Sequence, residues 1–119
     1  MNKSDLFSNL ARPNISDKIL VLTHTDLDGS GANIIINAIF DNVTTKYCSN
    51  STMSYDIKNA VCNPDEEQYD FIFACDISCT EADAKIIQAN PNHTKLLILD
   101  HHATALFLNE YSWACIHTD

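Results

Sequence analysis

Glycine is scarce in this sequence. Only two of the 119 residues are glycine, where an average usage near 7% would give about eight. Both of them, Gly29 and Gly31, fall within the ten-residue stretch 24–33. Because glycine is used where the backbone adopts a conformation that a Cβ atom disfavours, this concentration indicates an unusual backbone at 24–33. The stretch is a first candidate for a functional site.

Long hydrophobic runs are also missing. Runs such as 19–22, 34–36 and 96–99 fall far short of the roughly 20 residues needed to cross a bilayer. The polar N-terminal residues 1–10 lack the apolar core of a signal peptide. At 45% hydrophobic and 19% charged residues, the composition is that of one globular domain. We therefore expect a cytoplasmic protein with no membrane partner.

Basic residues are few, and no cysteines form a C-x-x-C pair. Five dispersed cysteines in an intracellular chain predict reduced, buried thiols, and Cys75 is expected to pack in a strand and not to act as a nucleophile. Lys and Arg number seven against 16 Asp and Glu, which gives a net charge of -9. Because proteins bind nucleic acid largely by neutralising its phosphates with Lys and Arg, a nucleotide substrate would require bound cations here.

Apolar periodicity predicts alternating strands and helices. Expected strands cover 18–23, 43–48, 69–75, 95–99 and 113–117, and expected helices cover 31–40, 51–62 and 80–90, with a helical lead-in at 1–16. Such alternation predicts an α/β fold with a mostly parallel sheet of about five strands and helices on both faces, in a Rossmann-like three-layer arrangement. The pattern does not predict the order of the strands.

Acidic and histidine side chains follow three of the predicted strands. They are His24, Asp26 and Asp28 after the first strand, Asp76 after the third, and Asp100, His101 and His102 after the fourth. The carboxyl ends of parallel strands meet at one edge, where such folds bind ligands. Carboxylates held close together repel one another unless they are protonated or bridged by cations. Carboxylate and imidazole ligands without thiolates suit Mn²⁺, Fe²⁺, Zn²⁺ or Mg²⁺, so the sequence predicts a metal centre.

Each motif also has a plain structural interpretation when taken alone. Asp76 could cap a helix or lie in a turn, the pair Asp28-Gly29 is a common turn signal, and residues 101–102 could be a solvated loop pair. The prediction of a site depends on all three motifs following apolar strands of the same sheet.

The three motifs together resemble those of the DHH phosphoesterase superfamily. HTDLDG at 24–29, CDIS at 75–78 and LILDHHAT at 97–104 follow the order and spacing of that family, and the resemblance covers about 18–104. Its members include RecJ-type exonucleases, oligoribonucleases, cyclic-dinucleotide phosphodiesterases and family II pyrophosphatases. The resemblance implies hydrolysis of phosphodiester bonds in short oligonucleotides or dinucleotides, with short RNA, single-stranded DNA, cyclic or linear dinucleotides and pyrophosphate all open as substrates.

The resemblance further implies two Mn²⁺-type ions, with Mg²⁺ or another divalent ion as the alternative. His24 and Asp26 would bind one ion, and Asp28 and His101 the other. Asp76 would bridge the two. A pair of such ions can clamp a phosphoryl group and generate the attacking hydroxide.

Two residues of the third motif are implied in catalysis. His102 would contact the scissile phosphate, and Asp100 would orient the neighbouring imidazoles. The family's fourth motif, a later Asp ligand, and its C-terminal substrate-binding domain have no counterpart before the last residue. We expect 1–119 to be the N-terminal part of a truncated DHH-type catalytic domain, which could associate as a homo-oligomer through its sheet edge or act as a catalytically incomplete metal- or nucleotide-binding fragment.

A competing interpretation comes from residues 26–30, DLDGS, which resemble the D-x-D-G signature of haloacid dehalogenase-type phosphatases. Asp26 would then be a covalent nucleophile and Asp28 the general acid. That signature should follow its strand directly, whereas 23–25 intervene, and the motif at 100–102 would have no role. The DHH interpretation accounts for all three motifs.

Overall fold

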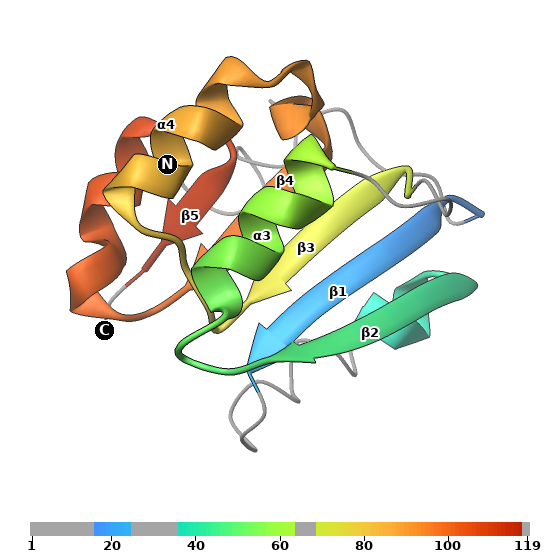
Figure 1. The fold of residues 1–119 in the computed structure, drawn as a ribbon. Coiled ribbons are helices and arrows are strands. Elements are labelled where there is room, and N and C mark those ends of the chain that lie inside the picture. Colours follow the sequence, from blue (N-terminus) through green and yellow to red (C-terminus); the bar gives the residue numbers. More distant parts are fainter. Residues whose placement is uncertain (1–15, 25–35, 64–68, 118–119) are drawn as a thin grey trace.

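The computed structural model describes residues 16–24, 36–63 and 69–117. In these ranges the chain forms a five-stranded sheet in the order β2-β1-β3-β4-β5, with every neighbouring pair parallel (Figure 1). The strands are β1 (Lys18–His24), β2 (Asn42–Cys48), β3 (Phe71–Cys75), β4 (Leu96–Asp100) and β5 (Ala114–Ile116). The predicted α/β fold with a parallel sheet is confirmed, and each strand lies within two residues of its predicted bounds.

Two α-helices pack side by side on one face of the sheet (Figure 1). They are α3 (Met53–Cys62) and α4 (Glu81–Ala89), both within the predicted helical segments. The chain after α4 forms the 3-10 helix η2 (Pro91–Lys95), and a second 3-10 helix, η3 (Ala103–Glu110), follows β4. No helix in the described ranges is long and apolar enough to span a membrane.

The opposite face carries the end of the predicted helix 31–40. Residues 36–39 are helical, and the Phe40 N–H donates to the Ile36 carbonyl at 3.0 Å. The earlier residues of that helix, and the predicted lead-in before residue 16, lie outside the described residues. Ile36 and Phe40 pack against the sheet, so helical residues cover both faces.

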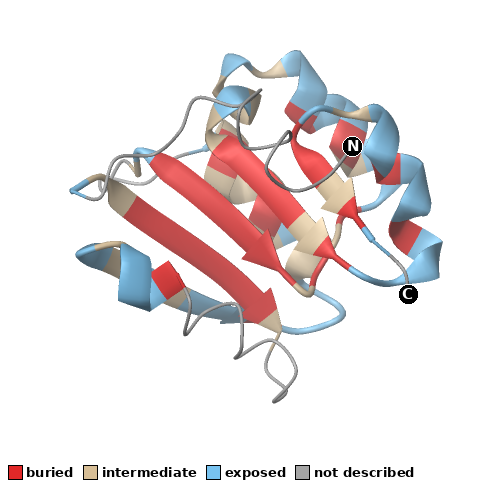
Figure 2. Cartoon of the chain, turned by 180° about the vertical axis from the view of Figure 1, so that it is seen from behind, coloured by how far each residue is buried: buried red, intermediate tan, exposed pale blue. Residues whose placement is uncertain are grey.

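Alternating side chains of β1 divide the core into two clusters, one on each face of the sheet. Leu20 and Leu22 belong to the cluster that contains Ile57 of α3. Ile19 and Val21 belong to the other cluster, on the face seen in Figure 2, where the central strands are buried along most of their length. β1 is therefore buried on both faces, which explains its uninterrupted apolar sequence.

Ser54 links α3 to the start of α4. Thr80 caps α4 by accepting a hydrogen bond from the Asp83 N–H at 3.2 Å. The Ser54 hydroxyl accepts from the Thr80 N–H at 2.9 Å and donates to Asp83 Oδ2 at 2.5 Å. Lys58 Nζ lies 3.3 Å from Asp83 Oδ1. The Ser54 hydrogen bond, helped by Lys58, holds the pKa of Asp83 below its ordinary value of 3.8.

Replacing Asp83 by asparagine should therefore destabilise the chain in a pH-dependent way. A carboxylate whose pKa is lower in the folded state stabilises that state above its unfolded pKa, and the effect is lost as the pH falls through the folded pKa. In urea unfolding, Asp83→Asn should be less stable than the unchanged chain at about pH 7. The difference should disappear well below pH 3.8. An equal deficit at both pH values would contradict the role of the charge.

All five cysteines are free thiols, as predicted, but only Cys48, Cys75 and Cys79 are buried, while Cys62 and Cys115 are partly exposed. Burial raises the pKa of Cys48, Cys75 and Cys79 to about 12 in each case. These thiols are therefore protonated and unreactive near neutral pH. The negative charge of Asp76 acts in the same direction on its neighbour Cys75, in agreement with a packing role for this cysteine.

Candidate metal centre

The carboxyl ends of β1, β3 and β4 meet at one edge of the sheet. The register pairs Thr23 with Cys75 and Cys75 with Leu99, so the residues that follow these three leave the sheet side by side. A cavity of about 290 Å³ opens at this edge. Its lining includes five of the predicted site residues, namely His24, Asp76, Asp100, His101 and His102.

Two of the predicted ligands, Asp26 and Asp28, lie outside the described residues, as do Gly29 and Gly31. The unusual backbone inferred for this stretch therefore stays a prediction. His24, at the end of β1, is the one residue of the first motif that the structure describes.

Asp76 follows β3 in a left-handed backbone conformation, with φ 61°. It is the one non-glycine residue with positive φ in the described ranges. Its N–H donates to the Leu99 carbonyl at 2.8 Å, which continues the pairing of β3 with β4. Its Oδ1 lies 2.6 Å from Nε2 of His101. Left-handed residues other than glycine cluster at functional sites, so the conformation itself points to this edge.

Asp100 holds both histidines that follow it. Its side chain is 1% exposed, and its Oδ1 accepts two hydrogen bonds. One comes from the backbone N–H of His101 at 2.8 Å, and the other from Nδ1 of His102 at 2.7 Å. The two imidazole rings stack with their centroids 4.5 Å apart and an angle of 26° between their planes. One buried carboxylate thus fixes the geometry of the third motif.

Two carboxylate oxygens of the site are buried without a hydrogen-bond partner among the described residues: Oδ1 of Asp76 and Oδ2 of Asp100. The short approach of Asp76 Oδ1 to His101 is thus a close contact without hydrogen-bond geometry. A buried polar atom without a partner costs about 1–3 kcal/mol. Oδ1 of Asp76 and Nε2 of His101 are both potential metal ligands. Because they lie close together without a hydrogen bond, they are suited to binding the same cation.

The size of this group fits a metal ion. One ligand atom from each of Asp76, Asp100, His101 and His102 can be chosen so that all four lie within 4.8 Å of one another. Ligands on opposite sides of an ion, with bonds of about 2.1 Å, are about 4.2 Å apart, so the widest separation in this group exceeds that of an ion's ligands by about 0.6 Å. These four residues could therefore hold a divalent ion, and their oxygen and imidazole donors are those expected for Mn²⁺, Fe²⁺, Zn²⁺ or Mg²⁺.

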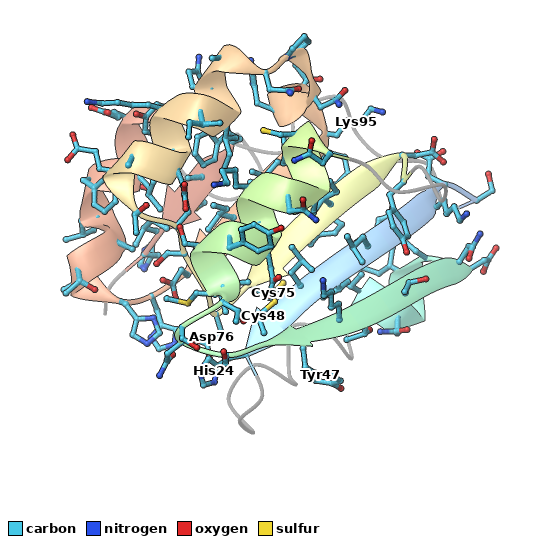
Figure 3. The ribbon with its side chains drawn as sticks, viewed as in Figure 1. His24, Tyr47, Cys48, Cys75, Asp76 and Lys95 are labelled. Carbon is cyan, nitrogen blue, oxygen red and sulfur yellow. The ribbon has the colours of Figure 1, made fainter. Side chains whose placement is uncertain are left out.

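The electrostatic character of the cavity is set by its acidic groups. Among the described residues that line it there is no Lys or Arg. Figure 3 shows His24 and Asp76 close together at the lower end of the sheet, while Lys95 lies at the opposite end of the molecule. A phosphate in this cavity would meet carboxylates and imidazoles, with no fixed cation from the described chain.

His24 lines the same cavity but is not one of the four clustered residues. Its Nε2 lies 2.8 Å from Oδ1 of Asn50, in the loop after β2. Asn50 was not predicted as a site residue. The available signal was its place at the carboxyl edge of β2, within the polar sequence Ser49-Asn50-Ser51-Thr52. Polar residues after a strand usually form turns, which is why this signal is weak.

Comparison with known proteins identifies the family of this chain. Residues 18–118 match the model of the DHH family, N-terminal domain. Oligoribonuclease NrnB of Bacillus subtilis (strain 168) is 28% identical over 103 residues, which cover 82% of this chain and 25% of that protein. The chain thus spans a quarter of the length of this curated relative, and no solved structure matches it. Because the family match covers most of the sequence and includes all three motifs, the chain belongs to the DHH family.

Proposed function

We propose that the chain is a divalent-metal-dependent phosphoesterase domain that hydrolyses phosphodiester bonds in short oligonucleotides or dinucleotides. The observation that carries this proposal is the group Asp76, Asp100, His101 and His102 in a cavity lined, among the described residues, by no Lys or Arg. An anionic phosphodiester would be repelled by these carboxylates unless cations were bound beside them. Membership of the DHH family and the oligoribonuclease activity in the name of the relative support a nucleotide substrate.

The proposed ligands form two sets that share one carboxylate. His24 and Asp26 would bind one ion, Asp28 and His101 the other, and Asp76 both. Oδ1 of Asp76 lies 2.6 Å from Nε2 of His101 and has no hydrogen-bond partner among the described residues, which supports a role of Asp76 between ligands. When bound, divalent ions of this kind neutralise phosphate charge and lower the pKa of water. We propose Mn²⁺, with Mg²⁺ or another divalent ion as the alternative, because the resemblance to the DHH family implies it and it accepts both carboxylate and imidazole ligands.

Asp100 and His102 are proposed to act on the substrate from the third motif. The hydrogen bond from Nδ1 of His102 to Asp100 fixes the ring and directs its Nε2 away from the carboxylate. In the imidazolium form, with its charge balanced by Asp100, the ring can donate from Nε2 to a phosphate oxygen. Such a donor, positioned in advance, stabilises the charge that develops on the phosphoryl oxygens during the reaction.

Metal removal tests the proposal. Hydrolysis of a 5′-labelled diribonucleotide should stop when the chain is treated with a chelator and should return when Mn²⁺ is added. The release of labelled mononucleotide, resolved by gel electrophoresis, measures the effect. Hydrolysis that persists in the metal-free chain would contradict a metal-dependent mechanism.

The same assay separates the alternatives. Mn²⁺ binding in calorimetry without turnover would favour a catalytically incomplete metal- or nucleotide-binding fragment. A phosphoryl group trapped on Asp26 and located by mass spectrometry would favour the haloacid dehalogenase interpretation, because that mechanism requires a covalent aspartyl-phosphate.

A further inference from the structure

Asn50 joins the loop after β2 to the end of β1. The register pairs His24 with Cys48, two residues before Asn50, so the two side chains leave neighbouring strands at the same edge. Oδ1 of Asn50 lies 2.8 Å from Nε2 of His24, and both residues line the cavity. This is a contact between residues 26 positions apart in the sequence.

Hydrogen bonds on both sides of Asn50 hold the loop that presents it. The Ser49 N–H donates to Thr52 Oγ1 at 3.1 Å, and the Ser49 carbonyl accepts from the N–H groups of Thr52 and Met53 at 3.1 and 2.9 Å. The Ser49 hydroxyl lies 3.0 Å from the hydroxyl oxygens of Ser51 and Thr52. A loop closed in this way places the amide before any ligand arrives, which is the general requirement for a precise site.

The chemistry of the contact sets the tautomer of the imidazole. An amide oxygen only accepts hydrogen bonds, so Nε2 of His24 carries a proton and donates it to Asn50. In the neutral ring Nδ1 then carries the lone pair. Histidines that bind metals usually donate from the other ring nitrogen to an oxygen, which fixes both tautomer and ring orientation.

From this geometry we infer that Asn50 is a positioning residue, which orients His24 so that Nδ1 is its metal-binding atom. The inference rests on the proposed function and adds a residue to it that lies outside the three motifs. Asn50 itself stays bound to the imidazole and contacts neither the ion nor the reacting phosphate.

The tautomer can be tested directly in the metal-free chain by ¹⁵N NMR of the His24 ring nitrogens. The unchanged chain should show mainly the form protonated at Nε2. Asn50→Ala should shift the ring toward a mixture of tautomers, and Asn50→Asp, which keeps an oxygen acceptor, should restore the original form. Asn63→Ala is the matched control, because Asn63 bonds only to Asn59 among the described residues and lies at the far end of α3. A ring protonated at Nδ1 in the unchanged chain, or one unaffected by Asn50→Ala, would overturn the inference.

Calorimetric titration with Mn²⁺ provides the second readout. Loss of a group that orients a metal ligand lowers affinity by about 10–100-fold, and we expect this for Asn50→Ala but not for Asn63→Ala. Tighter binding in Asn50→Ala would mean that Asn50 competes with the ion, which also overturns the inference. Absence of Mn²⁺ binding in the unchanged chain would contradict the proposed function itself. Unchanged affinity in Asn50→Ala beside a loss in His101→Ala would contradict only the role of Asn50.

Discussion

Replacing Asp76 by asparagine should abolish metal-dependent hydrolysis while leaving the chain folded. Asparagine adopts the left-handed conformation about as readily as aspartate, so the backbone and the hydrogen bond to the Leu99 carbonyl should be retained. The substitution removes the charge of a carboxylate proposed to bind both ions. We expect turnover to fall by at least about 10³-fold, the upper end of the effect of losing one preorganised electrostatic group. Initial rates at saturating Mn²⁺ measure this loss.

Unfolding in urea should accompany the kinetics. Because Asp76→Asn also relieves repulsion between neighbouring carboxylates, the free energy of unfolding should stay the same or rise. Asp70→Asn is the matched control, since Asp70 precedes β3 at the opposite end of the strand and accepts from the Lys18 N–H at 2.8 Å. It removes the same charge and should leave the rate unchanged. Near-normal turnover in Asp76→Asn would exclude a metal-bridging role.

Replacing Trp113 by alanine should have the largest effect on stability. Trp113 is fully buried, stacks on Tyr111 with ring centroids 4.7 Å apart, and donates from Nε1 to Gln88 of α4 at 2.9 Å. Truncating a buried Trp costs about 3–5 kcal/mol, a large part of the 5–15 kcal/mol typical of a domain. Urea or thermal unfolding should show a much lower midpoint. The cost arises from the cavity left between α4 and the sheet.

Two controls separate packing from hydrogen bonding and from aromatic character. Trp113→Phe keeps most of the buried volume and loses the donor to Gln88, so it should cost clearly less than the alanine variant. Phe107 is an aromatic residue of η3 with 40% of its surface exposed. Phe107→Ala should destabilise far less, because exposed side chains lose little on truncation. Equal losses in all three variants would contradict the assignment of Trp113 to the core.

The strands were predictable because their apolar runs are short, rich in branched residues and separated by turn signals or helical periods. The convergence of residues 24, 76 and 100–102 followed from one rule, since the carboxyl ends of parallel strands share an edge. The strand order was not predictable, because it depends on which apolar faces pack together over long sequence distances. Nothing local distinguishes Asn50 from an ordinary turn residue, and its contact with His24 appears only when β1 and β2 are paired. The roles of Asp26 and Asp28 stay predictions.

The left-handed backbone at Asp76 also limits which residues can replace aspartate at this position in related chains. With φ at 61°, glycine, asparagine and aspartate fit at low cost, whereas other residues pay about 1–2 kcal/mol for the close approach of Cβ to the backbone. Conformation thus restricts position 76 to a short set before any chemistry is considered. Within that set only aspartate is an anion. Almost every substitution at position 76 should therefore impair the chain. Most replacements are disfavoured by the backbone, and the tolerated ones lose the negative charge.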